Sequence, residues 1–118
     1  MPLHDTLAQF SDVVHSYEVF QYDVEGPHTR LKLRVIFHDE SRLHIRETVL
    51  EGQYRKYAYH WQNATGQLLI RWDNATHWPQ IGTYPHHRHI GNETQVEASD
   101  ATTLEEALVY IRAQLKKS

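Results

Sequence analysis

The sequence contains no cysteine and no apolar run long enough to cross a membrane. Without cysteine the chain can form neither a disulfide framework nor a thiolate metal site. The first residues show no basic segment followed by an apolar one, so no secretory signal is evident. We therefore expect a cytoplasmic protein that does not associate with membranes. At 118 residues the chain can build one core, which predicts a single domain over residues 1–118.

Charge is distributed unevenly along the chain. Residues 1–27 contain five acidic residues and no Lys or Arg, whereas residues 28–91 contain nine Lys or Arg and five acidic residues. Residues 92–118 are acidic again, with five acidic residues and three basic ones. The net charge of −3 therefore conceals a basic middle segment.

The hydrophobic pattern predicts a sheet between two helices. Apolar residues recur at helical spacing over residues 3–15 and in a last helix, which a capping box at residues 103–106 opens. A brief strand is expected near residues 94–97. Five further segments alternate apolar and polar residues, as half-buried antiparallel strands do, and they span 17–24, 30–38, 42–50, 54–62 and 67–73. The predicted fold is α+β, an antiparallel meander sheet of about five strands with N- and C-terminal helices packed on one face.

Strand register can be predicted because a slip of one residue would send the apolar side chains to the wrong face. In the first strand, Phe20, Tyr22 and Val24 should share the apolar face. We expect hairpin loops at residues 39–41 and 63–66. The cross-strand pairs would then be Phe37 with Leu43, Val35 with Ile45, Trp61 with Leu68, Tyr59 with Ile70 and Tyr57 with Trp72.

The sheet face opposite the apolar one is predicted to be basic, with Arg34 close to Arg46 across two strands. Like charges in such positions destabilise a sheet unless an anion relieves them. A basic stripe on an open sheet is typical of a protein that binds a phosphate backbone. An ordinary solvated face that discourages edge aggregation is the alternative. The residues of this face are Arg30, Lys32, Arg34, Arg42, His44, Arg46, Lys56, His60 and Arg71.

Residues 74–93 show little periodicity and contain four histidines, His77, His86, His87 and His89. A loop of this length in a small domain is usually functional or disordered. The histidines could bind a transition metal together with Asp73 or His60, although their spacing matches no specific metal motif. They could equally hold the loop in place through hydrogen bonds and ring stacking.

General acid–base chemistry is the third interpretation of these histidines. Cleavage of RNA without a metal needs a base for the 2′-hydroxyl, an acid for the leaving 5′-oxygen and cations near the phosphorane. Acid and base could come from His86, His87 and His89, with Tyr84 as an alternative acid. Arg71 or Arg88 could be the cation, and Asp73 could orient an imidazole. No cofactor or bound metal is required. Further residues with a predicted part in RNA binding are Trp78, which could stack on a base, and Arg88.

Three strings in this region resemble the TumE-type toxins of bacterial and archaeal toxin–antitoxin modules. They are Tyr59-His60-Trp61-Gln62, then Arg71-Trp72-Asp73-Asn74-Ala75-x-His77, and then Tyr84-Pro85-His86-His87-Arg88-His89-Ile90-Gly91. The similarity extends in order through roughly residues 17–115. It implies a growth-inhibiting toxin neutralised by a partner antitoxin, typically one that carries a DNA-binding helix-turn-helix.

From these observations we expect a toxin that binds RNA on the basic sheet face and cleaves it at the histidines. The alternative is a non-catalytic module that inhibits growth by occluding a nucleic-acid or ribosomal site. A homodimer and a hetero-complex with the antitoxin are both compatible with the sequence.

Overall fold

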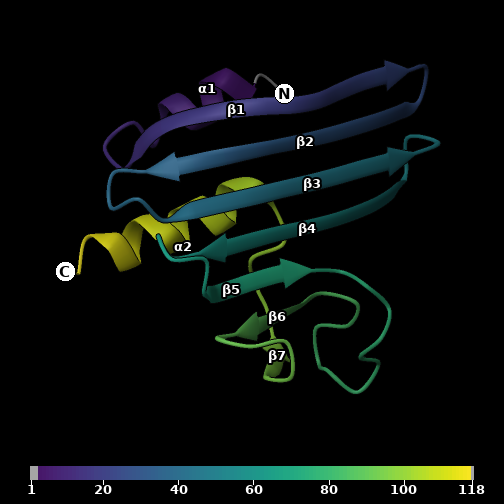
Figure 1. Ribbon diagram of the computed structural model, residues 1–118. Coiled ribbons are helices and arrows are strands. Elements are labelled where there is room, and N and C mark those ends of the chain that lie inside the picture. The colour runs from purple at the N-terminus through teal and green to yellow at the C-terminus, as the bar shows by residue number, and fades with distance from the viewer. Residues whose placement is uncertain (1–2, 118) are drawn as a thin grey trace.

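The computed structural model describes residues 3–117, which form a seven-stranded antiparallel meander and two helices (Figure 1). The strands lie side by side in the order in which they occur in the chain. This confirms the predicted α+β meander, with more strands than expected. The elements are α1 Leu3–Ala8, β1 Val14–Glu25, β2 His28–Phe37, β3 Arg42–Leu50, β4 Tyr54–Gln62, β5 Leu68–Asp73, β6 His87–Ile90, β7 Val96–Ala98 and α2 Leu104–Leu115.

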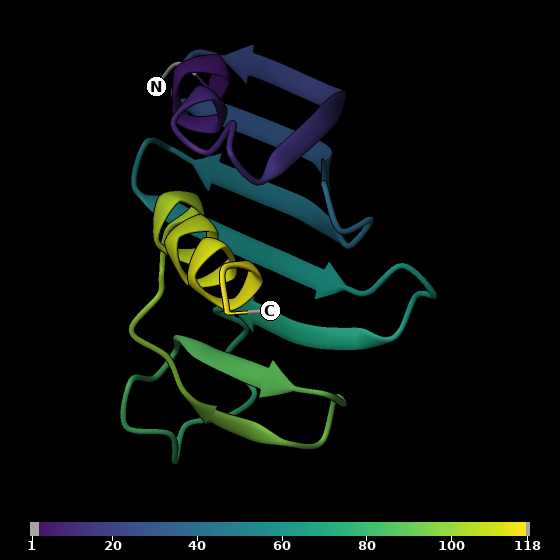
Figure 2. The same cartoon turned by 90° about the vertical axis from the view of Figure 1, so that its left-hand side faces the viewer.

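Both helices cover the same face of the sheet, as predicted (Figure 2). Helix α1 is shorter than expected, since it ends at Ala8 and not near residue 15. The chain turns after Ala8, and the β-branched Val14 begins strand β1. Phe10 and Val13, which were expected in the helix, lie outside it but are still buried. Helix α2 begins as predicted, because the Thr103 side chain accepts a hydrogen bond from the Glu106 backbone N–H.

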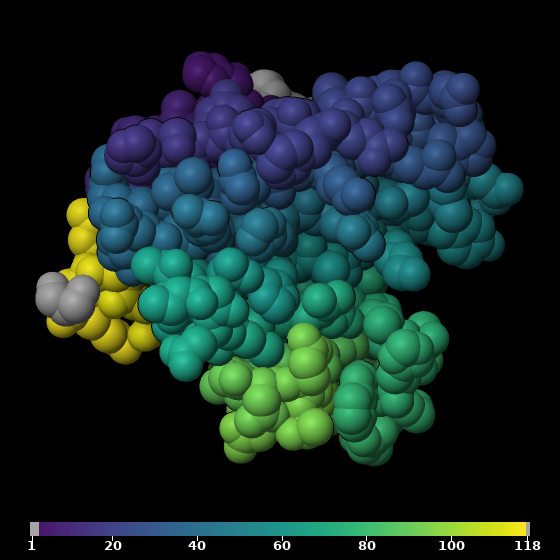
Figure 3. All heavy atoms as spheres, in the orientation of Figure 1, coloured from purple at the N-terminus to yellow at the C-terminus, as the bar shows by residue number. Residues whose placement is uncertain are grey.

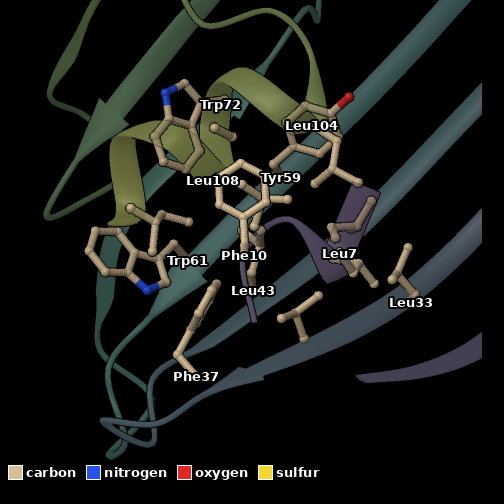
Figure 4. Close-up of a cluster of buried hydrophobic side chains, with 14 of the residues drawn as sticks. Leu7, Phe10, Leu33, Phe37, Leu43, Tyr59, Trp61, Trp72, Leu104 and Leu108 are labelled. Carbon is tan, nitrogen blue, oxygen red and sulfur yellow. The ribbon is translucent and has the colours of Figure 1, made fainter. Parts of the chain in front are cut away.

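The core fills the space between the two helices and the sheet (Figure 4). Each central strand contributes every second residue, and the helices contribute residues at helical spacing. This alternation explains why the sequence pattern predicted half-buried strands. The largest side chains of the core that are completely buried are Trp72, Tyr59, Phe10, Phe37, Leu33, Leu43, Ile45, Leu108 and Ile111.

A polar network on the helix side joins strands β3 and β4 to the entry of α2. The Tyr59 hydroxyl donates to Glu47 Oε2 over 3.0 Å and accepts from Arg55 Nη2 over 2.8 Å. Arg55 Nε also donates to Glu47 Oε1 over 2.7 Å, and its Nη2 donates to the carbonyl of Thr102. Burial and the nearby Glu47 carboxylate raise the pKa of Tyr59. The phenol therefore stays protonated and acts as a fixed link in this network.

No helix or strand within residues 3–117 covers the face of the sheet that is turned away from the two helices. Figure 3 shows this face, where atoms of α2 appear only along one edge. We refer to it as the open face. Cross-strand pairs such as Arg46 opposite Ala58 and His60 opposite Arg71 place the predicted basic positions there.

The register between β2 and β3 differs from the prediction by two residues. Val35 lies opposite Leu43, because Phe37 N–H donates to the Ser41 carbonyl and the loop consists of residues 38–40. The tight turn is possible because Glu40 adopts a positive φ of 70°, which is rare for a residue other than glycine. Arg34 consequently lies opposite His44, and not directly opposite Arg46 as the predicted register placed it. Lys32 is the residue opposite Arg46.

The register between β4 and β5 was also wrong by two residues. Tyr59 lies opposite Trp72 and Trp61 opposite Ile70. The next pair is Gln62 with Leu68, so the pairing between β4 and β5 skips Leu69. The Asn63 side chain accepts three hydrogen bonds within the turn and tightens it. A shift of two residues keeps Ile70 and Trp72 on their predicted face. The prediction is wrong for Leu68, which lies opposite Gln62, since Leu69 packs against the core in its place.

Strand β1 contains a bulge that the alternation did not predict. The register shifts between Val19 and Gln21, so Phe20 lies on the open face while Tyr22 and Val24 lie on the helix side. The prediction that these three residues share one face is therefore wrong for Phe20. Tyr22 and Val24 are themselves exposed, since neither helix reaches this end of the sheet.

The segment expected to be one long loop contains a strand. Residues 87–90 form β6, which pairs with β5 and with β7. The irregular parts are therefore residues 74–86, which lie beside the end of β5 in Figure 1, and the turn that begins at residue 91. No helix within residues 3–117 has the length and apolarity needed to cross a membrane.

Candidate functional site

A basic hollow of about 360 Å³ lies at the centre of the open face. Its floor contains Ala58, whose small side chain lies between Arg46 on one side and Asp73 on the other. Larger residues at the neighbouring positions form its walls. The lining residues are Phe20, Lys32, Leu33, His44, Ile45, Arg46, Ala58, His60 and Arg71.

Two imidazoles line this hollow side by side. His44 and His60 are cross-strand neighbours whose ring centroids are 6.3 Å apart. Partial burial and then the nearby arginines lower the pKa of both histidines, with Arg34 acting on His44 and Arg71 on His60. Both rings are therefore largely neutral at pH 7, where a neutral imidazole can accept a proton.

A second group, Asp73, His87 and His89, lies beside the hollow at the ends of strands β5 and β6. The strand pairing places His87 opposite Asp73 and His89 opposite Arg71, all on the open face. Asp73 Oδ1 is 2.8 Å from His87 Nε2, and Asp73 Oδ2 is 3.5 Å from His89 Nε2. We call Asp73, His87 and His89 the buried triad.

Arg71 links the buried triad to the hollow. Its Nε donates to Asp73 Oδ2 over 3.1 Å, while the same side chain lines the hollow. The backbone N–H of Ala75 donates to the other oxygen of Asp73 over 3.0 Å. The Asp73 carboxylate therefore fixes both the guanidinium and the start of the following loop.

Trp78 covers the buried triad from the loop side. Its ring centroid lies 6.4 Å from that of His87 and 6.3 Å from that of His89. The stacking partner predicted for an RNA base is therefore already in contact with two histidines. His77, which precedes it, is exposed.

The structure separates the predicted catalytic residues into two places. Arg71, Asp73, His87 and His89 come together on the open face, as described above. His86 does not join them, because its Nδ1 lies 2.8 Å from the Tyr57 hydroxyl on the helix side. Burial and then the positive charge of Arg55 lower the pKa of His86.

The predicted RNA-binding residues divide in the same way. Arg88 lies on the helix side, where it stacks over Tyr110 and donates to Glu97 over 2.7 Å. It therefore does not belong to the basic open face. Arg34 is on the open face but forms an ion pair with Glu18 over 3.7 Å, so the acidic edge strand partly neutralises it. Strand parity places the other predicted cations and imidazoles on the open face, namely Arg30, Lys32, Arg42, His44, Arg46, Lys56 and His60.

Sequence reasoning missed four residues of the hollow, namely Ala58, Phe20 and the two core residues Leu33 and Ile45. Ala58 could have been identified as the one small side chain in a strand of large ones, because such a position opens space between its neighbours. Phe20 could not, because its placement depends on the bulge in β1.

The seven-stranded meander with one helix-covered face and a basic open face defines a small α+β protein. Comparison with protein-family models gives a match to the family described as toxin TumE over residues 3–117. The chain therefore belongs to the TumE toxin family, and its partner is an antitoxin. Curated proteins and solved structures gave no significant match.

Proposed function

We propose that this toxin inhibits growth by binding RNA in the basic hollow and cleaving it there. The observation that carries the proposal is the convergence of Lys32, Arg46 and Arg71 around one recess beside two neutral imidazoles. Three cations at one recess favour a phosphate, and phosphate contacts supply most of the sequence-independent affinity for nucleic acid. An open antiparallel face is also wide enough to receive an extended single strand.

The geometry favours His44 and His60 as the pair that moves protons. In this proposal one neutral imidazole removes the proton from the 2′-hydroxyl, and the 2′-oxygen then attacks phosphorus. The other imidazole, protonated once the phosphate is bound, donates a proton to the leaving 5′-oxygen. The products would be a 2′,3′-cyclic phosphate and a 5′-hydroxyl end. No metal takes part in these steps.

His87 and His89, two of the residues predicted from sequence for this task, do not line the hollow. Each Nδ1 donates to a backbone carbonyl, that of Pro85 or Glu93, over 2.9 Å. Each Nε2 faces Asp73, and both rings are buried. In the proposed cleavage they therefore position Arg71 through Asp73. His86 has no part in it, since it contacts Tyr57 on the helix side.

The test is cleavage of a defined RNA by purified toxin, with the new ends mapped and their chemistry determined. We expect His60→Gln and His44→Gln each to reduce the cleavage rate by about 100-fold or more, in line with general acid–base catalysis. His38→Gln is a matched control, because His38 is an exposed histidine that does not line the hollow.

The same variants distinguish cleavage from occlusion. If Arg46→Glu abolishes toxicity in cells while His44→Gln and His60→Gln remain fully toxic, the protein acts by binding alone. If all three variants remain toxic and RNA 5′ ends are unchanged, the hollow is not the functional site.

We further propose that the antitoxin, expected to carry a helix-turn-helix, covers the hollow with an acidic surface. Opposite charges would then accelerate association at low ionic strength. Stopped-flow measurements should show an association rate that falls as salt increases. An association rate independent of salt would place the antitoxin elsewhere on the toxin.

A further inference from the structure

The buried triad has an arrangement of ring nitrogens that RNA cleavage in the hollow does not explain. A carbonyl oxygen can only accept a hydrogen bond, so Nδ1 of His87 and of His89 must each carry the proton donated to Pro85 or Glu93. In the neutral ring, Nε2 then holds a lone pair. Both lone pairs are directed at the region occupied by the Asp73 carboxylate.

These acceptor atoms are close together and shielded from water. The side chains of His87, His89 and Asp73 are 1%, 6% and 8% exposed. Although His87 Nε2 is 2.8 Å from Asp73 Oδ1, the angle does not suit a hydrogen bond, and Nε2 has no hydrogen-bond partner within residues 3–117. A carboxylate and two imidazole lone pairs in such proximity repel one another unless a cation lies between them.

We propose that the buried triad binds a divalent transition-metal ion of the zinc class through Asp73, His87 Nε2 and His89 Nε2. The candidate ligand atoms all lie within 4.8 Å of one another. Bonds of about 2.0–2.2 Å in a tetrahedral site separate neighbouring ligand atoms by about 3.3–3.5 Å. The observed separation of 3.5 Å lies at the upper end of that range and that of 2.8 Å lies below it, so small side-chain rotations suffice.

The groups around the triad have the form that metal sites require. Ligating histidines commonly donate the other ring N–H to a backbone carbonyl, which fixes the ring and its tautomer. Both histidines do so here. Two imidazoles and one carboxylate suit zinc-class ions, whereas calcium and magnesium prefer oxygen ligands alone. Arg71 and Ala75, which hold the Asp73 oxygens, would play the supporting role on the carboxylate side.

The consequence for the fold is local. The ion would tie β6 to the end of β5 beneath Trp78, and it would fix the carboxylate that orients Arg71 toward the hollow. Metal binding and RNA cleavage would use different residues, because the hollow residues are not ligands and the triad residues do not line the hollow.

The first experiment uses the untagged, full-length wild-type protein. After removal of bound metal with a chelator and dialysis, Zn²⁺ is added, and affinity and stoichiometry are measured by competition with a chromophoric chelator. We expect one ion per chain and a melting temperature that rises with Zn²⁺ concentration, as for any ligand bound only by the folded state. X-ray absorption of the zinc-loaded protein should show a shell of nitrogen and oxygen with two imidazoles.

Variants then locate the site. His87→Gln, His89→Gln and Asp73→Asn should each weaken Zn²⁺ binding by about 100-fold or more, since loss of mere supporting groups already costs 10–100-fold. The control is His15→Gln with His38→Gln, because those two exposed rings lie 5.6 Å apart and could bind metal adventitiously. This double variant should bind Zn²⁺ like the wild type.

Three results would overturn the proposal. They are a stoichiometry far below one ion per chain, an absorption spectrum without two imidazoles, and a loss of binding in the control but not in the triad variants. The absorption spectrum needs no variant, so it decides the matter even if a triad variant fails to fold. RNA cleavage that persists in the chelator would leave the metal proposal intact, since the two are measured separately.

Discussion

Replacing a cation of the hollow should change the salt dependence of RNA binding by a defined amount. Lys32, Arg46 and Arg71 line the hollow together. Each phosphate neutralised on a single strand contributes about −0.7 to the slope of log affinity against log salt, so three contacts give about −2. Affinity should then fall about 20-fold between 50 and 200 mM salt. Lys32→Gln should reduce the slope to about −1.4 and the fall to about 7-fold.

The assay is fluorescence anisotropy of a labelled oligouridylate with 2′-O-methyl sugars, which cannot be cleaved through the 2′-oxygen. Measurements at pH 8 keep His44 and His60 uncharged, because the pKa of each is below its ordinary value. Lys117→Gln is the matched control, since it removes one positive charge from an exposed position after α2. Equal changes in slope for Lys32→Gln and Lys117→Gln would show that net charge alone attracts the RNA. A wild-type slope near zero would refute phosphate binding.

Three further outcomes concern stability. Tyr59→Phe removes two hydrogen bonds of a buried network and leaves part of Glu47 unsatisfied. Urea denaturation should therefore show a free energy of unfolding lower by about 1–3 kcal/mol. An unchanged free energy of unfolding would contradict the network. Thr103→Ala should cost about 1 kcal/mol in the same assay, whereas Thr103→Ser should retain the cap. The folded-state pKa of His44 and of His60 lies below the unfolded value of about 6.5, so the unfolded chain binds more protons and stability should fall as pH drops from about 7 to 5. Replacing both histidines with Gln should lessen that fall, and an unchanged pH profile would argue against the lowered pKa values.

Strand parity was predictable because burial enforces it along each strand. Five strands and the basic open face follow from alternation, and the start of α2 follows from its capping box. The register was not predictable to the residue. It depends on the positive φ at Glu40, the turn around Asn63 and the bulge at Phe20, and none of these three is specified by hydrophobicity. An error of two residues changes the neighbours of Arg34 while preserving its face.

Strand β6 escaped prediction for a different reason. It has only four residues, His87 to Ile90, and three of them are polar or charged, so it lacks the alternation that marks a strand. Its open-face residues are buried by Asp73 and Trp78, and these contacts come from distant positions in the chain. Pairing with β5 therefore decides the local structure, as tertiary contacts commonly do for short strands.

The formation of β6 determines which histidines can act together. In a flexible loop His86, His87 and His89 could all turn toward Asp73, which is why the sequence suggested them as one group. Within a strand, successive residues point to opposite faces, so His87 and His89 share the open face while Arg88 faces α2. His86, just before the strand, is held on the helix side by Tyr57. Arg71 and Asp73 are two residues apart on β5 and therefore share the open face. The contact between these two side chains joins the hollow to the buried triad.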